Sequence, residues 1–406
     1  MTDALPIDTG DTAWLLMSSA LVLAMIVPGL ALFYGGLVRS KNVLGTIMQT
    51  VVILCMMTLT WILWGYTLAF GPDHGGIIGG LEWVALNGVG LAPSPDYAST
   101  VPHQVFMFFQ LMFAAITVAL ITGSFAERMK FKALILFALL WSTFIYSPLA
   151  HWVWGGGWLG KLGALDFAGG AVVHVSSGMA ALVCALVLGV RKGYGVEPMP
   201  PHNLPMTLLG TGLLWFGWFG FNAGSALGAN EIAGVAFLAT HTAAAAGGVS
   251  WMMAEWMYRG QPTVLGVASG IIAGLATITP GAGYVGPVSA LLIGLIAGAL
   301  CYAAVVWKVR LGYDDSLDVV GIHGVGGIIG LLATGVLASI GAKGLLFGNP
   351  GQFGIQLLLV LTTALFALVG TYLILKVVDL MVGLRVSPQD EELGLDLSQH
   401  SERAYS

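Results

Sequence analysis

Long apolar runs separated by short polar stretches follow one another along almost the entire chain. Because about 20 apolar residues cross a bilayer as one helix, each run of that length predicts a membrane span. The runs predict eleven helices, over residues 13–35, 43–70, 104–125, 133–150, 170–190, 204–224, 232–257, 264–279, 287–307, 319–340 and 353–383. The first run exceeds the apolar core of a secretory signal and no Lys or Arg precedes it, so it is interpreted as a transmembrane helix.

Composition supports the same interpretation. Of the 406 residues, 57% are hydrophobic and 9% are charged, whereas about 25% are charged in a soluble domain. The net charge of -5 is small for this length and gives no reason to expect a nucleic-acid partner. Cys55, Cys184 and Cys301 lie in apolar runs without paired spacing and are interpreted as packing residues. We therefore expect an all-α integral membrane protein.

Basic residues gather in every second loop. Those that follow the odd-numbered runs are Arg39, Lys41, Arg128, Lys130, Lys132, Arg191, Lys192, Arg259, Lys308 and Arg310. Between the other runs only Lys161 and Lys343 occur. Because loops rich in Lys and Arg stay on the cytoplasmic side, the pattern predicts an outside N-terminus and a cytoplasmic C-terminus.

A carboxylate stands eight residues before a histidine at two places in the chain. Asp166 precedes His174, and Asp315 precedes His323, and each histidine is followed by an apolar, Gly-rich run. The fifth predicted helix enters the membrane from outside and the tenth from the cytoplasm. We therefore expect the two histidines to meet near the membrane midplane from opposite directions.

This repetition predicts an internal duplication with inverted topology. The two five-helix repeats are expected over 12–190 and 204–340, and an extra eleventh helix over 353–383. All of them belong to one polytopic domain over 1–383. The remaining residues, 384–406, form a polar cytoplasmic tail that is interpreted either as solvated or as a regulatory contact.

Ionisable groups at membrane depth need an explanation, because each costs about 2.5–3.5 kcal/mol on insertion scales. Hydrogen bonding between helices explains a single histidine, and His241 is interpreted as such a packed or interface residue. The pair His174 and His323 favours a polar line through an apolar conduit. Asp166 is expected to cap the N–H groups of the helix that follows it, and its charge favours a nearby cation.

Aromatic residues cluster where the outer mouth is expected. They are Phe109, Phe113, Trp152, Trp154, Trp215, Trp218 and Phe221. A ring face that meets a cation contributes about 0.5–2 kcal/mol. Because no carboxylate cluster is present to replace a hydration shell, such a site favours a small, weakly hydrated monovalent cation over a divalent one.

Other chemistries find less support. Neither His174 nor His323 has a further Cys or Glu at helical spacing, so no metal site is expected. Haem bound by the two histidines remains an alternative. No phosphate-binding loop and no nucleophile with a base occur in the sequence, so we expect neither an enzyme nor a cofactor.

Several longer motifs identify a family. They are PGLALFYGG at 28–36, FAER at 125–128, HWVWGGG at 151–157, the run at 166–174, WFGFNAGS at 218–225 and HGVGG at 323–327. With them the sequence resembles the ammonium transporters of the Amt, Mep and Rh family, and its bacterial Amt branch, along essentially the whole chain.

The resemblance implies a role for each site residue. Phe113, Trp154 and Ser225 would form an outer ammonium site with Phe109 close by. Phe113 and Phe221 would form a stacked gate beneath that site. Asp166 would support recruitment and deprotonation of the ion. His174 and His323 would line a hydrophobic pore that conducts ammonia and relays the proton separately, since neutral ammonia crosses apolar walls more cheaply than its ion.

The resemblance also implies partners and a location. It implies a multi-pass protein of the cell membrane that forms a homotrimer with one path per subunit. The tail would meet a cytoplasmic signalling protein of the PII type. The chain has His400-Ser401-Glu402 where the family usually has His-Gly-Glu. A passive Rh-like channel for ammonia or carbon dioxide, and an ammonium sensor, stand as alternatives.

Overall fold

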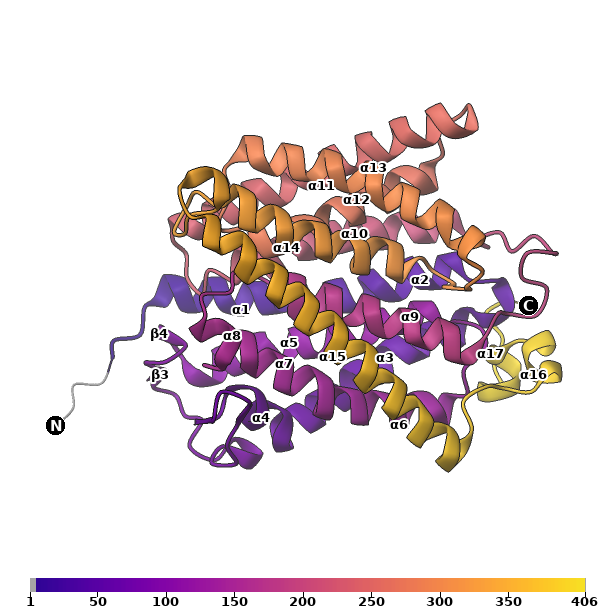
Figure 1. Cartoon of the computed structure of the whole chain (residues 1–406). Helices are drawn as coiled ribbons and strands as arrows, with labels where there is room; N and C mark the ends of the chain where they lie inside the picture. Colours follow the sequence, from indigo (N-terminus) through magenta and orange to yellow (C-terminus); the bar gives the residue numbers. More distant parts are fainter. Residues whose placement is uncertain (1–4, 406) are drawn as a thin grey trace.

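Eleven helical spans run side by side through the molecule, as predicted. The structure is a computed structural model that describes residues 5–405. Within that range, eleven helices are long and apolar enough to cross a membrane. The start of α1 and the tail helices α16 and α17 lie at opposite ends of the bundle (Figure 1), as an odd number of spans requires.

The α-helices are α1 (Thr9–Ala24), α2 (Ala31–Leu37), α3 (Val43–Thr60), α4 (Tyr66–Phe70), α5 (His103–Ile121), α6 (Phe131–Trp141), α7 (Ser147–Val153), α8 (Trp158–Lys161), α9 (Ser176–Leu188), α10 (Leu204–Gly224), α11 (Glu231–Arg259), α12 (Val264–Ile278), α13 (Pro287–Leu311), α14 (Val325–Leu337), α15 (Pro350–Val382), α16 (Pro388–Leu393) and α17 (Leu395–His400). The predicted spans match these helices, with ends that differ by a few residues.

Wider π-helical turns interrupt three of these spans and begin two others. They are η1 (Met25–Leu30), η3 (Trp61–Gly65), η6 (Ser142–Tyr146), η7 (Gly170–Val175) and η9 (Val320–Gly324). Turns of this kind are frequent at functional sites. His174 lies in η7 and His323 lies in η9, so each of the two histidines stands where its helix is locally widened.

The turns η7 and η9 are built in the same way, which supports the internal duplication. Asp166 accepts a hydrogen bond from the N–H of Ala171 (2.8 Å), and Asp315 accepts one from the N–H of Val320 (2.7 Å). Each donor lies five residues after its carboxylate. Burial raises the pKa of Asp315 to about 6, although the nearby Lys308 opposes this shift.

Glycines let the two histidine-bearing helices touch. A Cβ on Gly178 would lie 2.2 Å from the Cα of Gly324, which is shorter than any real contact. Small residues at such crossings allow backbones to approach closely. Gly178 and Gly324 therefore set the distance at which the rings of His174 and His323 face each other.

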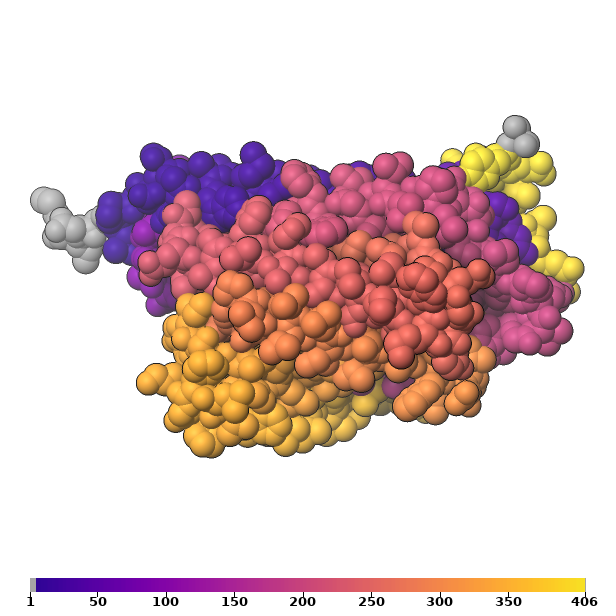
Figure 2. All heavy atoms as spheres, turned by 90° about the horizontal axis from the view of Figure 1, so that it is seen from above, coloured from indigo at the N-terminus to yellow at the C-terminus, as the bar shows by residue number. Residues whose placement is uncertain are grey.

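Apolar side chains cover the outer surface of the bundle. Figure 2 shows the face that is covered largely by the segments from α10 to α15, in pink to orange. On α13, the exposed large apolar residues are Val288, Leu291, Leu292, Leu295, Ile296, Leu300, Trp307, Val309 and Leu311. Such a surface is suited to lipid or to another subunit, and it agrees with the assignment as an integral membrane protein.

The long loop between α4 and α5 adds short strands to the helical fold, at the end of the bundle that the sequence predicts to face outward and that is called the outer end below. The strands β1 (Asp73–His74) and β2 (Ile78–Gly79) form one hairpin, and β3 (Pro93–Ser94) and β4 (Ala98–Pro102) form another. The Tyr97 hydroxyl donates to the carbonyl of Phe70 (2.6 Å), which fixes the second hairpin to the end of α4. These hairpins cover the outer end of the bundle beside the site described below.

The tail packs on the helix ends at the side of the bundle that the sequence predicts to be cytoplasmic, called the cytoplasmic end below, and it is not simply solvated. The Asp396 carboxylate accepts hydrogen bonds from the N–H groups of Leu44 (3.1 Å) and Gly45 (2.8 Å). These are free N–H groups in the first turn of α3, where a carboxylate also complements the helix dipole. The N–H of Leu395 donates to the Asn42 side chain (2.8 Å). The tail therefore caps α3.

A buried ion network ties the loops of this cytoplasmic end together. The Glu127 carboxylate accepts hydrogen bonds from the backbone N–H and the Nε of Arg39 (both 2.7 Å), and it lies 3.4 Å from Nη1 of Arg191. Arg191 in turn donates from Nε to Asp314 (2.8 Å). Burial opposes ionisation of Glu127, but Arg191 and Arg39 outweigh it and hold the pKa of Glu127 below its ordinary value.

Replacing Glu127 with Ala should lower the free energy of unfolding by about 3 kcal/mol, because it removes the buried carboxylate that pairs with the partly buried Arg39 and leaves Arg191 with Asp314 alone. Thermal unfolding of the purified protein in detergent measures the change. Glu197→Ala, at an exposed carboxylate, is the control. Because the pKa of Glu127 is depressed, its contribution is present above about pH 4.3 and is lost as the pH falls through the depressed value. A difference between the variants that grows in acid would contradict the role of the ionised pair.

Candidate functional site

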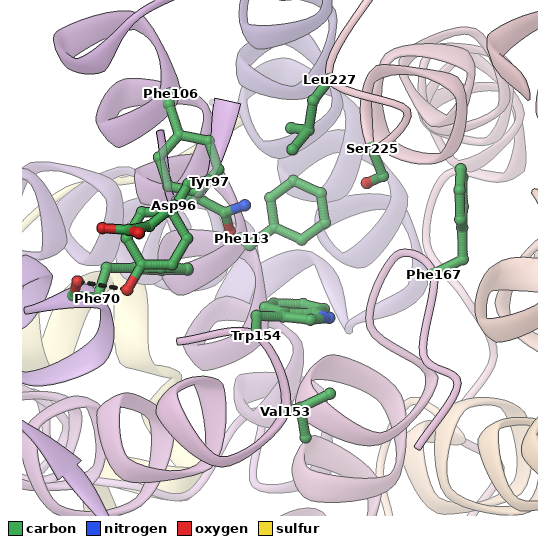
Figure 3. A pocket seen from close by; sticks show the side chains of 11 residues that line it. Phe70, Asp96, Tyr97, Phe106, Phe113, Val153, Trp154, Phe167, Ser225 and Leu227 are labelled. Carbon is green, nitrogen blue, oxygen red and sulfur yellow. Dashed lines mark hydrogen bonds between the residues drawn. The ribbon is translucent and has the colours of Figure 1, made fainter. Parts of the chain in front are cut away.

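An open cavity of about 270 Å³ lies at the outer end of the bundle (Figure 3). It is lined by Phe70, Asp96, Tyr97, Phe106, Gln110, Phe113, Val153, Trp154, Phe167, Ser225 and Leu227. The Phe113 ring lies between Ser225 on one side and Tyr97 on the other, with the Trp154 ring beside it. The Phe113 and Trp154 rings are 5.8 Å apart and nearly perpendicular (86°).

Three of the predicted site residues meet in this cavity. Phe113 comes from α5, Trp154 from the end of α7, and Ser225 from the end of α10. Phe109 contacts Phe113, with ring centres 5.0 Å apart, but it is fully buried and is not among the residues that line the cavity. The Ser225 hydroxyl donates to the carbonyl of Phe221 (2.8 Å), so its oxygen remains free to accept a hydrogen bond.

The cavity also contains residues that the sequence did not indicate. They are Phe70, Asp96, Tyr97, Phe106, Gln110, Val153, Phe167 and Leu227. A signal existed for some of them, because Phe106, Gln110 and Phe113 are spaced by four and three residues and therefore share one face of α5. Asp96 and Tyr97 come from the outer loop, whose path no helical pattern predicts.

Two of the aromatic positions lie away from the expected outer mouth. Trp218 stacks on His174 at 5.6 Å, deeper in the bundle, and Trp215 stacks on His241 at 5.3 Å on the outer surface of the helices. The course of α10 explains the depth of these residues, because successive positions three or four residues apart lie about one helical turn farther from its outer end. Trp152 packs on Phe366 at 4.5 Å, beside and not inside the cavity.

Two stacked rings close the floor of the outer cavity. Phe113 and Phe221 are 4.3 Å apart and nearly parallel (18°). A second, mainly apolar cavity of about 10 Å³ is lined by Phe221, His174, His323 and side chains such as Ile116, Val173 and Leu214. That volume is close to the room that one water needs, so any path through this region is narrow.

The Asp166 carboxylate sits in a cradle of backbone N–H groups. It accepts hydrogen bonds from Gly169 (2.9 Å), Gly170 (2.5 Å), Ala171 (2.8 Å) and Val172 (3.2 Å). Gly169 has a φ of 110°, which favours glycine and lets the chain curl around the carboxylate. The expected capping role of Asp166 is therefore confirmed.

The same loop holds Trp154 in place. The indole N–H of Trp154 donates to the backbone carbonyl of Asp166 (2.8 Å). On the other side, the Gln356 side chain accepts a hydrogen bond from the N–H of Leu165 (2.8 Å) and donates one to its carbonyl (2.7 Å). Asp166 does not itself line the outer cavity, and it is connected to that cavity through its hydrogen bond with Trp154.

The two histidines meet, as their positions predicted. Their Nδ1 atoms are 3.2 Å apart and their ring centres are 5.1 Å apart. The Nε2 of His174 lies 3.3 Å from the Thr279 hydroxyl. That hydroxyl donates to the carbonyl of Leu275 (2.8 Å) and accepts from Trp218 (3.0 Å).

These bonds assign the protons of the pair. Because the Thr279 hydroxyl proton is used, Thr279 can only accept from His174, which places the proton of neutral His174 on Nε2. The Nδ1 of His174 is then an acceptor, and His323 donates to it from Nδ1. The Nε2 of His323 is left as an acceptor. The pair can thus pass a proton along one hydrogen-bonded line.

A wider cavity of about 690 Å³ opens toward the cytoplasmic end. Leu265 and Ser269 line it, and they lie seven and three residues before Ile272, which lines the histidine cavity. These three residues share one face of α12. Among residues 5–405, no group of three or more His, Cys, Asp or Glu side chains could hold a metal ion.

A family model described as the Ammonium Transporter Family matches residues 13–405. The chain belongs to this family. It is 51% identical to an ammonium transporter of Bacillus subtilis over 402 residues, which is 98% of both chains. It is 50% identical to the ammonium transporter Amt1 of Archaeoglobus fulgidus over 400 residues, which is 98% of this chain and 99% of that one.

Solved structures of related proteins share the fold of this Ammonium Transporter Family member. The crystal structure of Saccharomyces cerevisiae Mep2 has a TM-score of 0.88 at 38% identity and covers 94% of this chain and 88% of that chain. A structure named Sensor Amt Protein has a TM-score of 0.90 at 32% identity, and it covers 96% of this chain and 98% of that chain. The resemblance in the sequence motifs is therefore confirmed, and the chain is a multi-pass membrane protein.

Replacing Asp166 with Ala should lower the free energy of unfolding by about 3 kcal/mol or more, because four N–H groups lose a charged acceptor. Asp166→Asn keeps one acceptor oxygen and should cost less. Chemical denaturation in detergent compares them, with Asp96→Ala at an exposed carboxylate as the control. Equal stability of the wild type and the Ala variant would show that the cradle does not depend on the carboxylate.

Proposed function

We propose that this protein transports ammonium across the cell membrane. The observation that carries the proposal is the succession, along one line, of an aromatic outer cavity, a stacked phenylalanine pair and two hydrogen-bonded histidines. Its relatives at about half identity are named ammonium transporters, which agrees with it.

The outer cavity would hold the ammonium ion. The perpendicular rings of Phe113 and Trp154 offer their faces, and the Ser225 hydroxyl offers an acceptor oxygen. Such a set can bind an ion with four N–H donors through ring faces and a neutral oxygen, without a carboxylate in direct contact with it. The nearby Asp166 makes the cavity more favourable for a cation, without direct contact.

The ion would lose its proton before it passes the stacked rings of Phe113 and Phe221. An ion would be poorly solvated in the narrow apolar cavity below, whereas neutral ammonia crosses it cheaply. The proton would travel separately along the His174–His323 pair, through the contact between the two Nδ1 atoms. Transfer from His174 to His323 would require both rings to exchange the tautomers assigned above. The wider inner cavity would return both species to water.

The placement in the cell follows from the sequence and from the family. The basic residues of every second loop favour an outside N-terminus and a cytoplasmic tail. The resemblance supports a homotrimer with one path in each subunit. The packed tail would be the surface for a PII-type signalling protein. Since the relatives are named as transporters, we infer no enzymatic activity.

Two other functions remain testable alternatives. A passive Rh-like channel would pass ammonia or carbon dioxide as gas, but the acceptor oxygen and ring faces of the outer cavity suit a cation. The similarity to the structure named Sensor Amt Protein favours an ammonium sensor as the second candidate. A sensor would bind the ion with little flux.

Current in proteoliposomes after an ammonium jump tests the proposal. The wild type should give a saturable current, and the His174→Ala, His323→Ala double variant should lose the current or its selectivity for ammonium over potassium. Internal alkalinisation without current would favour the passive channel. Ammonium binding without either signal would favour the sensor.

Deleting residues 384–406 should reduce the maximum current and leave the ammonium concentration for half-maximal current unchanged, because the tail caps α3 far from the outer cavity. The single variant Asp396→Ala should lower stability by about 1 kcal/mol, the usual value of a lost helix cap. Proteoliposome currents test the deletion, and thermal unfolding in detergent tests Asp396→Ala. A truncated protein with full current would leave the tail without a role in transport.

A further inference from the structure

Gln110 is a buried polar side chain without a partner in the outer cavity. Its side chain lines the cavity and the residue is only 8% exposed. Its Oε1 atom is buried and has no hydrogen-bond partner among residues 5–405. Buried amides are normally hydrogen-bonded, because an unpaired one loses its contacts with water and gains nothing. An amide left in this state inside a cavity is suited to a ligand that donates hydrogen bonds.

The position of Gln110 is fixed by its helix. It lies on the same face of α5 as Phe106 and Phe113, with the spacing of one turn on either side. It is the polar member of that stripe, directly next to the Phe113 ring that forms one wall of the outer site. The O and N of an amide are exchanged by a half-turn of the group, so the oxygen can be presented to the cavity without any movement of the helix.

The ammonium ion needs such an acceptor. Its four N–H groups point to the corners of a tetrahedron. The faces of Phe113 and Trp154 and the oxygen of Ser225 serve at most three of them. Within the cavity, the carboxamide of Gln110 stands on the helix that carries Phe113 and is free to accept the fourth.

We propose that Gln110 binds the ammonium ion directly in the outer cavity through its amide oxygen and sets the preference for ammonium over methylammonium. This inference rests on the proposed function. A neutral amide accepts the hydrogen bond without trapping the ion as a buried carboxylate would. Negative charge is supplied nearby by Asp96, which lines the same cavity at its mouth (Figure 3).

Selectivity follows from the number of donors. Methylammonium has three N–H groups, so one of its four directions is a methyl group that needs no acceptor. If the amide is replaced by an apolar side chain, the methyl group can face it without loss, whereas ammonium loses a hydrogen bond. The variant should therefore favour methylammonium relative to the wild type.

The test uses currents from proteoliposomes with Gln110→Leu, Gln110→Glu and the matched control Gln104→Leu. Gln104 lies on the same helix, bonds the carbonyl of Val89 (3.1 Å) and does not line the cavity. For Gln110→Leu, we expect the half-saturating ammonium concentration to rise about tenfold, as for a lost hydrogen bond to a charged group, and that for methylammonium to rise much less. Gln110→Glu keeps the acceptor and should saturate at or below the wild-type concentration. Gln104→Leu should behave as the wild type.

The outcomes separate this inference from the proposed function. If the wild type gives no ammonium current, both the proposed function and the role of Gln110 are contradicted. A normal wild type with an unchanged Gln110→Leu variant removes the role of Gln110 alone. The proposal would be overturned if Gln110→Leu and Gln110→Glu raised the half-saturating ammonium concentration equally, or if Gln110→Leu raised it equally for ammonium and methylammonium. Either result would indicate a packing role for Gln110. Thermal unfolding of each variant, with Gln110→Met in place of a Leu variant that fails to fold, keeps the comparison valid.

Discussion

The hydrogen bonds between the Asp166 carboxylate and four successive N–H groups organise the outer half of the molecule. They hold open the π-helical turn that carries His174, since a carboxylate occupies the place where the preceding helical turn would supply acceptors. Through the carbonyl of the same residue they also fix Trp154. One buried carboxylate therefore positions both the Trp154 ring, which lines the outer cavity, and the His174 ring, which lines the small cavity below it.

The two repeats use the same device with different surroundings. Asp315 also receives an N–H group five residues later, but it lies at the cytoplasmic end beside Lys308, which contacts the carboxylate of Asp318. Asp166 has no such cation beside it in the described part of the chain. The duplication thus yields two similar helix starts with different electrostatic surroundings, because Asp315 lies near Lys308 and Asp166 has no such neighbour within residues 5–405.

Much of the architecture could be predicted from the sequence. The eleven spans follow from the length of the apolar runs, and the contact between His174 and His323 follows from the repeated spacing at opposite ends of two helices. The cap formed by Asp166 follows from a carboxylate that precedes glycines. These features depend on short stretches of chain whose chemistry has few alternatives.

Other parts of the site depend on contacts that no local pattern reveals. Gln356 reaches the backbone of Leu165 across 191 residues of sequence, and a glutamine in an apolar helix carries no sign of its partner. The outer hairpins place Asp96 and Tyr97 through tertiary packing. The charged sequence of the tail left open whether it is solvated or makes a contact. Asp396 binds free N–H groups of α3, which only the folded chain brings near.

The helix α15 gives the last of these contacts a mechanical meaning. It runs for 33 residues without an interruption, a length of about 50 Å at the usual rise per residue, while five other spans are loosened by wide turns. Near one end of α15, Gln356 is hydrogen-bonded to Leu165 in the loop of Asp166. At the other end the chain continues directly into the tail, which caps α3. One continuous helix thus connects the contacts at the two ends of the bundle, so a tilt of α15 at the tail would also move Gln356 and with it the loop that holds Trp154.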